Sequence, residues 1–567
     1  MRMLDEIWNN FAKSPDAIAI ETAERVVTYS ELLSRIEFYR NYFTKEGLVA
    51  GDRVLLSLKR DLEMHAVAIA LFSMGVTYIP IAKGSSKSRI ENIGNKVAAR
   101  WMVGNDWSWK IDAGTPTSLE VVERRNIRPT SLPDQLAYIM FTSGSTGDPK
   151  GVMISRSAME SFLYAMIERL NIDAKIRMLA NTELSFDVSV PEIYLPFIVG
   201  GSVVFADEVT QNNLNMLPVL LTKCNLAQAT PSLWSLLIES GWTPNNNQVL
   251  VAGGEALSIS LARQLCQARS AWNFYGPTEA TVWASSWKIK NSSPRVLLGS
   301  PLNNSEFHLL PLDNDEFELG ISGACLADGY VADTAATDAS FVNLEGRRIY
   351  RTGDIVGRHK DGSLEWLRRR DSLVKVRGHR ISTLEVKNAV EGSTGITGCA
   401  VDVVGSAGSA SQLIAYITTN SRFENIKFLE NEIKNSIPPY MIPDRWIEVE
   451  YFPLNRNGKC DLRRLRQEHF DCTTGLFNRI DSLEAENRSI RNVVLDGFAH
   501  VLPVTAGNVS RDFRSLGVTS SQLMIVSALI SQDLALSIPV GALLSAGSIA
   551  ASVEYVENLN SIKKEED

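Results

Sequence analysis

The sequence has few cysteines, no excess of positive charge and no long apolar run. Its six cysteines are scattered over 567 residues without a CxxC pair, which predicts neither a zinc site nor a disulfide framework. The formal net charge is -8, so composition does not support a broad nucleic-acid-binding face. No apolar run is long enough to span a bilayer, and the N-terminus lacks the apolar core of a signal peptide. We therefore expect a cytoplasmic protein that binds neither nucleic acid nor membrane.

The chain does have length and an alternation of strand and helix patterns. With 567 residues, it should form several units of ordinary domain size. Short apolar runs with the character of buried strands occur at 54–58, 76–81, 136–141, 201–206 and 248–253. Helical patterns, such as the one at 62–75, lie between them. This alternation predicts an α/β fold with a parallel sheet covered on both faces.

Two smaller units follow the α/β region. After a basic run at 368–370 the pattern becomes α+β: helices at about 384–392 and 423–437, strands at 398–405 and 412–419, and a loop at 438–446. A short linker at 471–478 then leads to a segment with helical periodicity and no convincing strand. We predict three domains: a large α/β domain at 1–370 with parallel or mixed sheets, a small α+β domain at 371–470, and a helical bundle at 479–558.

A segment rich in glycine and hydroxyl groups follows the predicted strand at 136–141. It reads TSGSTGDPKG, residues 142–151. Glycines let backbone N–H groups wrap closely around an anion, and hydroxyls and a lysine add further donors. The spacing GxxxxGK[ST] of a Walker loop is absent. The two interpretations are a flexible surface loop and a phosphate-binding loop of another kind.

This loop and four later segments resemble, in the same order, the motifs of the adenylate-forming superfamily. That superfamily includes acyl-CoA synthetases, luciferases and the adenylation domains of nonribosomal peptide synthetases. The later segments are NFYGPTE (273–279), YRTGD (350–354), RRD followed by VKVRGHRI (369–381), and PLNRNGK (453–459). The resemblance covers about residues 5–467. It implies that ATP activates a carboxylate as an acyl-adenylate and that pyrophosphate is released.

The resemblance implies a role for residues at the phosphates. Joining two anions requires cations and preorganised dipoles. Lys459 would reach the substrate carboxylate and the bridging oxygen, and Glu279 would bind Mg²⁺; with Thr142 they would form the catalytic set. The remaining phosphate-loop residues would hold the β- and γ-phosphates of ATP: Ser143, Gly144, Ser145, Thr146, Gly147 and Lys150.

The resemblance also implies how the nucleoside is held. Tyr275 would lie along the adenine, and Asp354 would accept hydrogen bonds from both ribose hydroxyls. Arg369 would add a ribose contact. Asp371 would be the hinge about which a mobile small domain rotates between the two half-reactions.

FDVSVPE, residues 186–192, resembles a segment of the members that activate amino acids. There Asp187 would pair with the substrate α-ammonium, which a fatty acid lacks. The specificity positions of the family fall on Asp187, Val188, Pro191, Gln228, Val251, Gly253, Phe274, Val282, Trp283 and Lys459. Two of these are bulky and only Asp187 and Lys459 are charged, so the pocket should be small and should suit an uncharged side chain.

The set of pocket residues resembles glycine-activating pockets, and nearby strings also resemble D-alanine–carrier protein ligases. We therefore expect a small amino acid as substrate: glycine first, then alanine, then serine or cysteine. A bulky aromatic substrate is not expected.

FRSLGVTSSQL, residues 513–523, resembles the LGxxS segment of carrier domains. Ser520 would carry 4′-phosphopantetheine, attached by a phosphopantetheinyl transferase. Its neighbours, Thr519 and Ser521, depart from the usual pattern, and a plain helix N-cap serine is the alternative.

These resemblances together imply a peptide-synthetase-type adenylation domain fused to a peptidyl carrier domain. We expect a stand-alone loading module of a peptide natural-product pathway, which passes the loaded residue to downstream biosynthetic enzymes. An MbtH-like protein is a candidate helper. The alternatives are an acyl- or aryl-acid:CoA ligase and a non-catalytic carrier scaffold.

Overall fold

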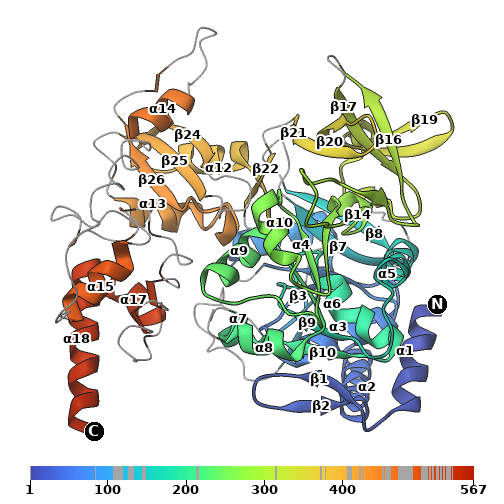
Figure 1. Cartoon of the computed structure of the whole chain (residues 1–567). Helices are drawn as coiled ribbons and strands as arrows, with labels where there is room; N and C mark the ends of the chain where they lie inside the picture. The colour runs from blue at the N-terminus through green and yellow to red at the C-terminus, as the bar shows by residue number, and fades with distance from the viewer. Residues whose placement is uncertain are drawn as a thin grey trace.

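The computed structural model describes residues 2–566 with interruptions, and all that follows concerns the described residues. The interruptions are 83–84, 106–118, 125–132, 134, 143–148, 212–215, 313–315, 371–372, 377–378, 405–411, 420–422, 424, 450–451, 454–461, 470–489 and most of 500–539. In chain order, Figure 1 shows a large N-terminal body coloured blue to yellow, a smaller orange body, and a red helical body. The predicted division into α/β, α+β and helical regions is confirmed.

A nine-stranded sheet forms one layer of the N-terminal body. Its order is β15 (Ser300–Pro301), β14 (Ser285–Lys288), β13 (Ser270–Tyr275), β12 (Val249–Gly253), β11 (Leu226–Ala229), β9 (Arg177–Ala180), β10 (Ser202–Phe205), β1 (Ile18–Glu21) and β2 (Val26–Thr28). The strands from β13 to β1 are parallel to their neighbours, and the remaining pairs are antiparallel. β10 and β12 confirm the strands predicted at 201–206 and 248–253.

A seven-stranded sheet forms the second layer. Its order is β18 (Gly329–Tyr330), β8 (Lys150–Ser155), β7 (Leu136–Thr142), β4 (Thr77–Pro80), β3 (Arg53–Ser57), β5 (Trp101–Gly104) and β6 (Glu120–Glu123). The four strands from β7 to β5 pair in parallel, and they include the predicted strands 136–141, 76–81 and 54–58.

Two almost fully buried helices, α3 (Glu63–Ser73) and α6 (Ser189–Val199), share one apolar core with strands of both sheets. Nine consecutive residues of α3 and ten of α6 are buried, which is the pattern of a helix surrounded by protein. The other helices of this body are α1 (Arg2–Lys13), α2 (Tyr29–Lys45), α4 (Lys87–Lys96), α5 (Arg156–Leu170), α7 (Glu208–Gln211), α8 (Leu217–Lys223), α9 (Pro231–Glu239), α10 (Ile259–Leu265) and α11 (Thr334–Ser340), with the short 3₁₀ helix η1 (Thr278–Ala280).

A third, antiparallel sheet completes the N-terminal body, and the sequence did not foresee it. Its order is β16 (Glu306–Pro311), β17 (Glu316–Ser322), β20 (Arg347–Arg358) and β19 (Phe341–Leu344), and β21 (Leu364–Arg369) also pairs with β20. β16 and β17, β19 and β20, and β20 and β21 are consecutive elements of the described chain, so the strand–helix alternation that reveals the parallel sheets is missing at these pairs. The YRTGD motif lies on β20.

The small domain has its own apolar core. It consists of the hairpin β22 (Leu373–Val376) and β23 (His379–Ser382), helices α12 (Thr383–Glu391), α13 (Ile426–Ile433) and α14 (Leu462–His469), the 3₁₀ helix η2 (Pro439–Met441), and the sheet β24 (Ile396–Val404), β25 (Gln412–Thr419) and β26 (Arg445–Glu448). The predicted helices and strands are confirmed. The prediction of a loop at 438–446 is wrong for its last two residues, because β26 begins at Arg445 and pairs in parallel with β25.

The described residues of the C-terminal region form a separate helical core. Helices α15 (Ile490–Ala499), α17 (Val540–Ala546) and α18 (Ile549–Glu566) contribute to it. Helix α18 continues to Glu566, past the predicted domain limit at 558. Within the described part of the chain, no helix combines the length and the apolar character needed to cross a bilayer.

Candidate functional site

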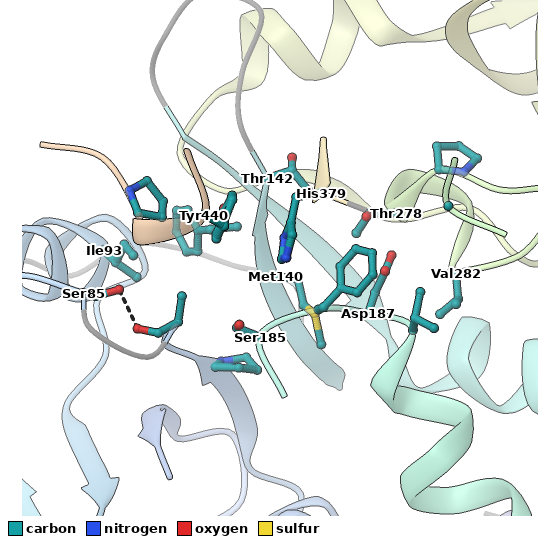
Figure 2. A pocket seen from close by; sticks show the side chains of 18 of the residues that line it. Ser85, Ile93, Met140, Thr142, Ser185, Asp187, Thr278, Val282, His379 and Tyr440 are labelled. Atoms are coloured by element: carbon teal, nitrogen blue, oxygen red, sulfur yellow. Dashed lines mark hydrogen bonds between the residues drawn. The ribbon is translucent and has the colours of Figure 1, made fainter. Parts of the chain in front are cut away.

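A cavity of about 80 Å³ lies where the large body faces the small domain (Figure 2). The large body contributes the ends of β4 and β7, including Met140 and Thr142, and the segment that leads into α6. The small domain contributes His379 from β23 and Tyr440 from η2. Residues far apart in the chain therefore converge on one cavity.

Asp187 places a carboxylate at this cavity (Figure 2), and Asp187 is only 6% exposed. Local turns hold its segment: the backbone N–H of Ser189 donates to the carbonyl of Phe186, and that of Val190 to the carbonyl of Asp187. Helix α6 begins two residues later, and the positive end of its dipole favours a negative charge here. The predicted ammonium-binding carboxylate is thus at the cavity wall.

Val282 and Trp283 also line the cavity, and they lie at the end of a strained turn. Thr281 has φ 53° and Val282 has φ 70°, values that are unusual for β-branched residues. The turn is held by hydrogen bonds from the Thr281 hydroxyl to the Cys325 carbonyl (2.6 Å) and from the Ala284 N–H to the Tyr275 carbonyl (2.8 Å). This turn brings Val282 and the indole of Trp283 to the cavity.

Trp283 closes the cavity against β12. The indole is 2% exposed and meets the ring of Phe274 edge-on, at 6.1 Å between centroids. A Cβ added to Gly253 would lie 2.7 Å from Cη2 and 2.9 Å from Cζ3 of the indole. The six-membered ring of Trp283 therefore rests directly on the backbone of Gly253, and no methyl group fits between them.

Gln228 is buried beside the start of α6 and does not line the cavity. Its Nε2 donates to the carbonyl of Val188 (2.6 Å) and to Oε1 of Glu192 (2.9 Å). Glu192 also accepts from the N–H and hydroxyl of Thr182, and burial raises the pKa of its carboxyl. Of the predicted pocket residues in the described structure, Asp187, Val188, Val282 and Trp283 line the cavity, whereas Pro191, Gln228, Val251, Gly253 and Phe274 do not.

The predicted nucleoside residues converge on Asp354, which is 1% exposed. Its Oδ2 accepts from the hydroxyl of Tyr275 (2.6 Å), and its Oδ1 accepts from Nη1 of Arg369 (3.0 Å). Trp366, which sequence reasoning missed, also donates from Nε1 to Oδ1 (2.9 Å). Burial and the negative charge of Asp354 raise the pKa of Tyr275, so Tyr275 stays a neutral donor.

Glu279 and Lys150, the first residue of β8, both contact Tyr330. The Tyr330 hydroxyl donates to Oε1 of Glu279 (2.8 Å), and the Lys150 ammonium lies 4.9 Å from the centroid of the Tyr330 ring. The backbone is fixed as well, because the N–H of Ala327 donates to the carbonyl of Glu279 (2.9 Å). Tyr330 thus connects two predicted site residues, although no motif drew attention to it.

Several predicted site residues lie outside the described residues, and the structure says nothing of them. They are Ser143, Gly144, Ser145, Thr146, Gly147, Asp371, Lys459 and Ser520. Sequence reasoning in turn missed Arg89, which lines the cavity from α4, and His379 and Tyr440 of the small domain. The RGHRI string contains His379, but nothing in the string shows which body its side chain meets.

Comparison with known proteins identifies two matched regions of the chain. Residues 7–331 match the family of AMP-binding enzymes, and residues 492–556 match the phosphopantetheine attachment site. The chain is 29% identical over 559 residues to a dimodular nonribosomal peptide synthase of Bacillus subtilis, a match that covers 90% of this chain and 23% of that protein. The chain thus spans about a quarter of the length of that relative.

Two solved structures are similar over 98% of this chain. Holo-PA1221, described as a nonribosomal peptide synthetase protein with adenylation and carrier domains bound to a vinylsulfonamide inhibitor, has a TM-score of 0.79 at 22% identity, with 96% of its chain covered. Holo-AB3403, a four-domain nonribosomal peptide synthetase bound to AMP and glycine, has a TM-score of 0.59 at 28% identity, with 42% of its chain covered.

The chain belongs to the family of AMP-binding enzymes. In the same chain a phosphopantetheine attachment site follows the AMP-binding region, and this combination is similar to that of nonribosomal peptide synthetases.

Proposed function

We propose that this chain activates glycine with MgATP as glycyl-adenylate and transfers the glycyl group to a phosphopantetheine thiol on its own carrier domain. The observation that carries the choice of glycine is the closure of the cavity by Trp283 against Gly253. A larger side chain would have to occupy the space of the indole. Holo-AB3403, which was solved with glycine bound, supports the same choice, and alanine is the next candidate.

The described residues suit the adenylation half-reaction. Asp187 would bind the substrate ammonium by a charge-assisted contact and thereby orient the carboxylate for attack on the α-phosphorus, with pyrophosphate as the leaving group. Asp354 would accept hydrogen bonds from the ribose hydroxyls, flanked by Tyr275, Trp366 and Arg369. Lys459 would neutralise the charge that gathers on the bridging oxygen.

Glu279 fits a Mg²⁺ site of the type found with nucleotides. Mg²⁺ is usually held by one or two carboxylates together with substrate phosphates and water. Glu279 provides one such carboxylate, 2% exposed and fixed by Tyr330, whose ring also contacts Lys150 at the end of the predicted phosphate loop. Bound there, the ion would offset negative charge on the phosphates. The loop itself, Thr142 to Lys150, would supply backbone and hydroxyl donors.

The carrier domain implies the rest of the cycle. A phosphopantetheinyl transferase would modify Ser520, and a downstream enzyme would accept the loaded glycyl group. We retain 1–370, 371–470 and 479–558 as the domain limits, Asp371 as the hinge, and an MbtH-like protein as a candidate helper. Asp187 argues against an acyl-CoA ligase, because a simple fatty acid has no ammonium group with which the Asp187 carboxylate could pair.

The deciding experiment is ATP–pyrophosphate exchange with each standard amino acid. We expect glycine to give the highest rate. Asp187→Asn should abolish the exchange while ATP binding persists, because the ammonium loses its charged partner. Glu183→Gln, on the same segment, is the matched control and should behave as wild type. Exchange with acids that lack an α-amino group, retained in Asp187→Asn, would favour the acyl-CoA ligase instead.

The loading half-reaction is tested separately. Ser520→Ala should prevent a gain of phosphopantetheine in intact mass and should block thioester formation, while pyrophosphate exchange continues. Modification that persists in Ser520→Ala and disappears in Ser521→Ala would move the attachment site by one residue. A wild-type chain that no transferase modifies would contradict loading in cis.

A further inference from the structure

Arg60 binds the carbonyl groups of segment 180–182, which consists of the last residue of β9 and the two residues after it. The side chain belongs to a residue that is only 6% exposed. It donates from Nη2 to the carbonyl of Ala180 (2.6 Å) and from Nη1 to that of Thr182. A third bond, from Nε to the carbonyl of Ala206 (2.6 Å), connects it to the residue that follows β10. A guanidinium buried in this way needs all of its acceptors, so it fixes the positions of these carbonyls.

Glu192 of α6 binds the N–H groups of the same segment. Its Oε2 accepts from the N–H of Asn181 (2.9 Å) and of Thr182 (2.8 Å), and its Oε1 accepts from the Thr182 hydroxyl (2.6 Å). Nε2 of Gln228, on β11, is a fourth donor at 2.9 Å from Oε1. A carboxylate has about four lone-pair positions for hydrogen bonds. Four donors therefore use all of them, and this geometry suits the ionised form.

Gln228 connects Glu192 to the residue that follows Asp187. Its Nε2 also donates to the carbonyl of Val188 (2.6 Å), and Val188 lines the cavity together with Asp187. These two acceptors fix the orientation of the amide, because its oxygen in the place of Nε2 would meet two other oxygens. Residues 183–188, all of them described, belong to no helix or strand. The position of Asp187 therefore depends on how this stretch is held at its two ends.

We propose that Glu192 is a positioning residue for the amino-acid half of the site. Its carboxylate holds the chain before Asp187 at segment 180–182 and, through the amide of Gln228, after Asp187 at Val188. The carboxylate of Asp187 lies between these two anchors and is thereby kept where the substrate ammonium binds. This inference rests on the proposed function for the role of Asp187.

The network is separate from the residues assigned to the nucleoside. The side-chain hydrogen bonds of Glu192 and Gln228 reach segment 180–182, Val188 and each other, whereas Asp354 lies on β20 of the antiparallel sheet. A loosened network should therefore weaken the binding of glycine and leave the binding of ATP in place. Displacing a site group by about 1 Å can cost roughly 10²-fold, which sets the upper end of the expected effect.

The test is pyrophosphate exchange by the full chain, with glycine and ATP varied separately. Glu192→Gln keeps the size of the side chain but places an amide where four donors meet. Gln228→Leu leaves Glu192 three of its four donors and removes the bond to Val188. Both variants should raise the KM for glycine roughly 10- to 100-fold and keep the KM for ATP within about twofold of wild type.

Gln248→Leu is the matched control, because a merely structural effect should appear there as well. Gln248 is also a buried glutamine whose Nε2 donates to a backbone carbonyl, that of Leu221 (2.7 Å). It precedes β12, at the opposite end of that strand from Gly253. Gln248→Leu should lower the Tm, as Gln228→Leu does, but it should leave the KM for glycine unchanged.

An unchanged KM for glycine in folded Gln228→Leu would overturn the assignment. An equal rise in the KM for ATP, or the same rise for glycine in Gln248→Leu, would also overturn it. If Glu192→Gln does not fold, Thr182→Val takes its place. It removes the 2.6 Å hydroxyl bond to Glu192 and should raise the KM for glycine roughly threefold or more; no rise would count against the proposal.

The wild-type enzyme separates this inference from the function on which it rests. If it exchanges best with another amino acid, the choice of glycine is refuted and the variants are compared with that substrate instead. Exchange with no amino acid would refute the proposed function, and this inference with it.

Discussion

Replacing Trp283 with alanine should widen the substrate range of this enzyme. The wild-type indole touches the backbone at Gly253, where an added Cβ would lie only 2.7 Å from Cη2. Leucine has four more carbon atoms than glycine, and each misfitting methylene costs about 1–3 kcal/mol in discrimination. The wild type should therefore favour glycine over leucine by roughly 10³-fold or more, and Trp283→Ala should reduce that preference by at least about 10²-fold.

The assay is pyrophosphate exchange with glycine, alanine, valine and leucine, compared as kcat/KM. Removing a buried tryptophan costs about 3–5 kcal/mol of stability, so a thermal melt must show that the variant is folded, and Trp283→Leu offers a milder enlargement. The matched control is Trp287→Ala. Trp287 lies on the neighbouring strand β14 and packs into the separate apolar cluster that includes Trp234, so its loss should leave selectivity unchanged.

Two results would refute this reasoning. The first is a wild-type enzyme that activates leucine or phenylalanine better than glycine and alanine. The second is a folded Trp283→Ala variant with the selectivity of the wild type, since the space of the indole would then not be what limits the substrate.

Further predictions concern catalysis, metal dependence and pH. Lys459→Ala should slow adenylation by roughly 10²-fold or more in pyrophosphate exchange, because a charge donor to the bridging oxygen is lost; a near wild-type rate would contradict its role. Tyr330→Phe removes the 2.8 Å hydrogen bond to Glu279, worth about 1.5–3 kcal/mol for a charged acceptor. It should weaken ATP binding roughly tenfold in a Mg²⁺ titration and leave binding without Mg²⁺ unchanged; equal weakening in both conditions would argue against a metal role for Glu279. In helix α3, burial and then the charge of Arg60 lower the pKa of His65 to about 3. Between about pH 3 and pH 6.5, the unfolded chain binds a proton at His65 that the folded chain does not bind. The stability contributed by the neutral imidazole is therefore complete above pH 6.5 and is lost as pH falls, by up to about 1.4 kcal/mol per pH unit. His65→Leu should flatten the acid side of a plot of Tm against pH, and an unchanged slope would show that other groups control it.

Local sequence was sufficient for five strands of the two parallel sheets and for most of the small domain. Runs such as 136–141 and 249–253 are apolar throughout, because strands covered on both faces bury every side chain. The buried helix α3 is apolar for the same reason. These features depend on the chemistry of neighbouring residues, so they can be read without knowing what packs against them. The motif strings likewise identified the family before any geometry was known.

The antiparallel sheet and the partners within the site were decided by the tertiary structure. Trp366 reaches Asp354 across the pairing of β20 with β21, and Tyr275 comes to the same carboxylate from a different sheet, 79 positions away. Tyr330 meets Glu279 because the segment 327–331 pairs with both β8 and the η1 turn. His379 enters the cavity only because the small domain faces the large one. Hydrophobic periodicity reports which face of an element is buried, whereas the partner of a side chain depends on how separate elements pack together.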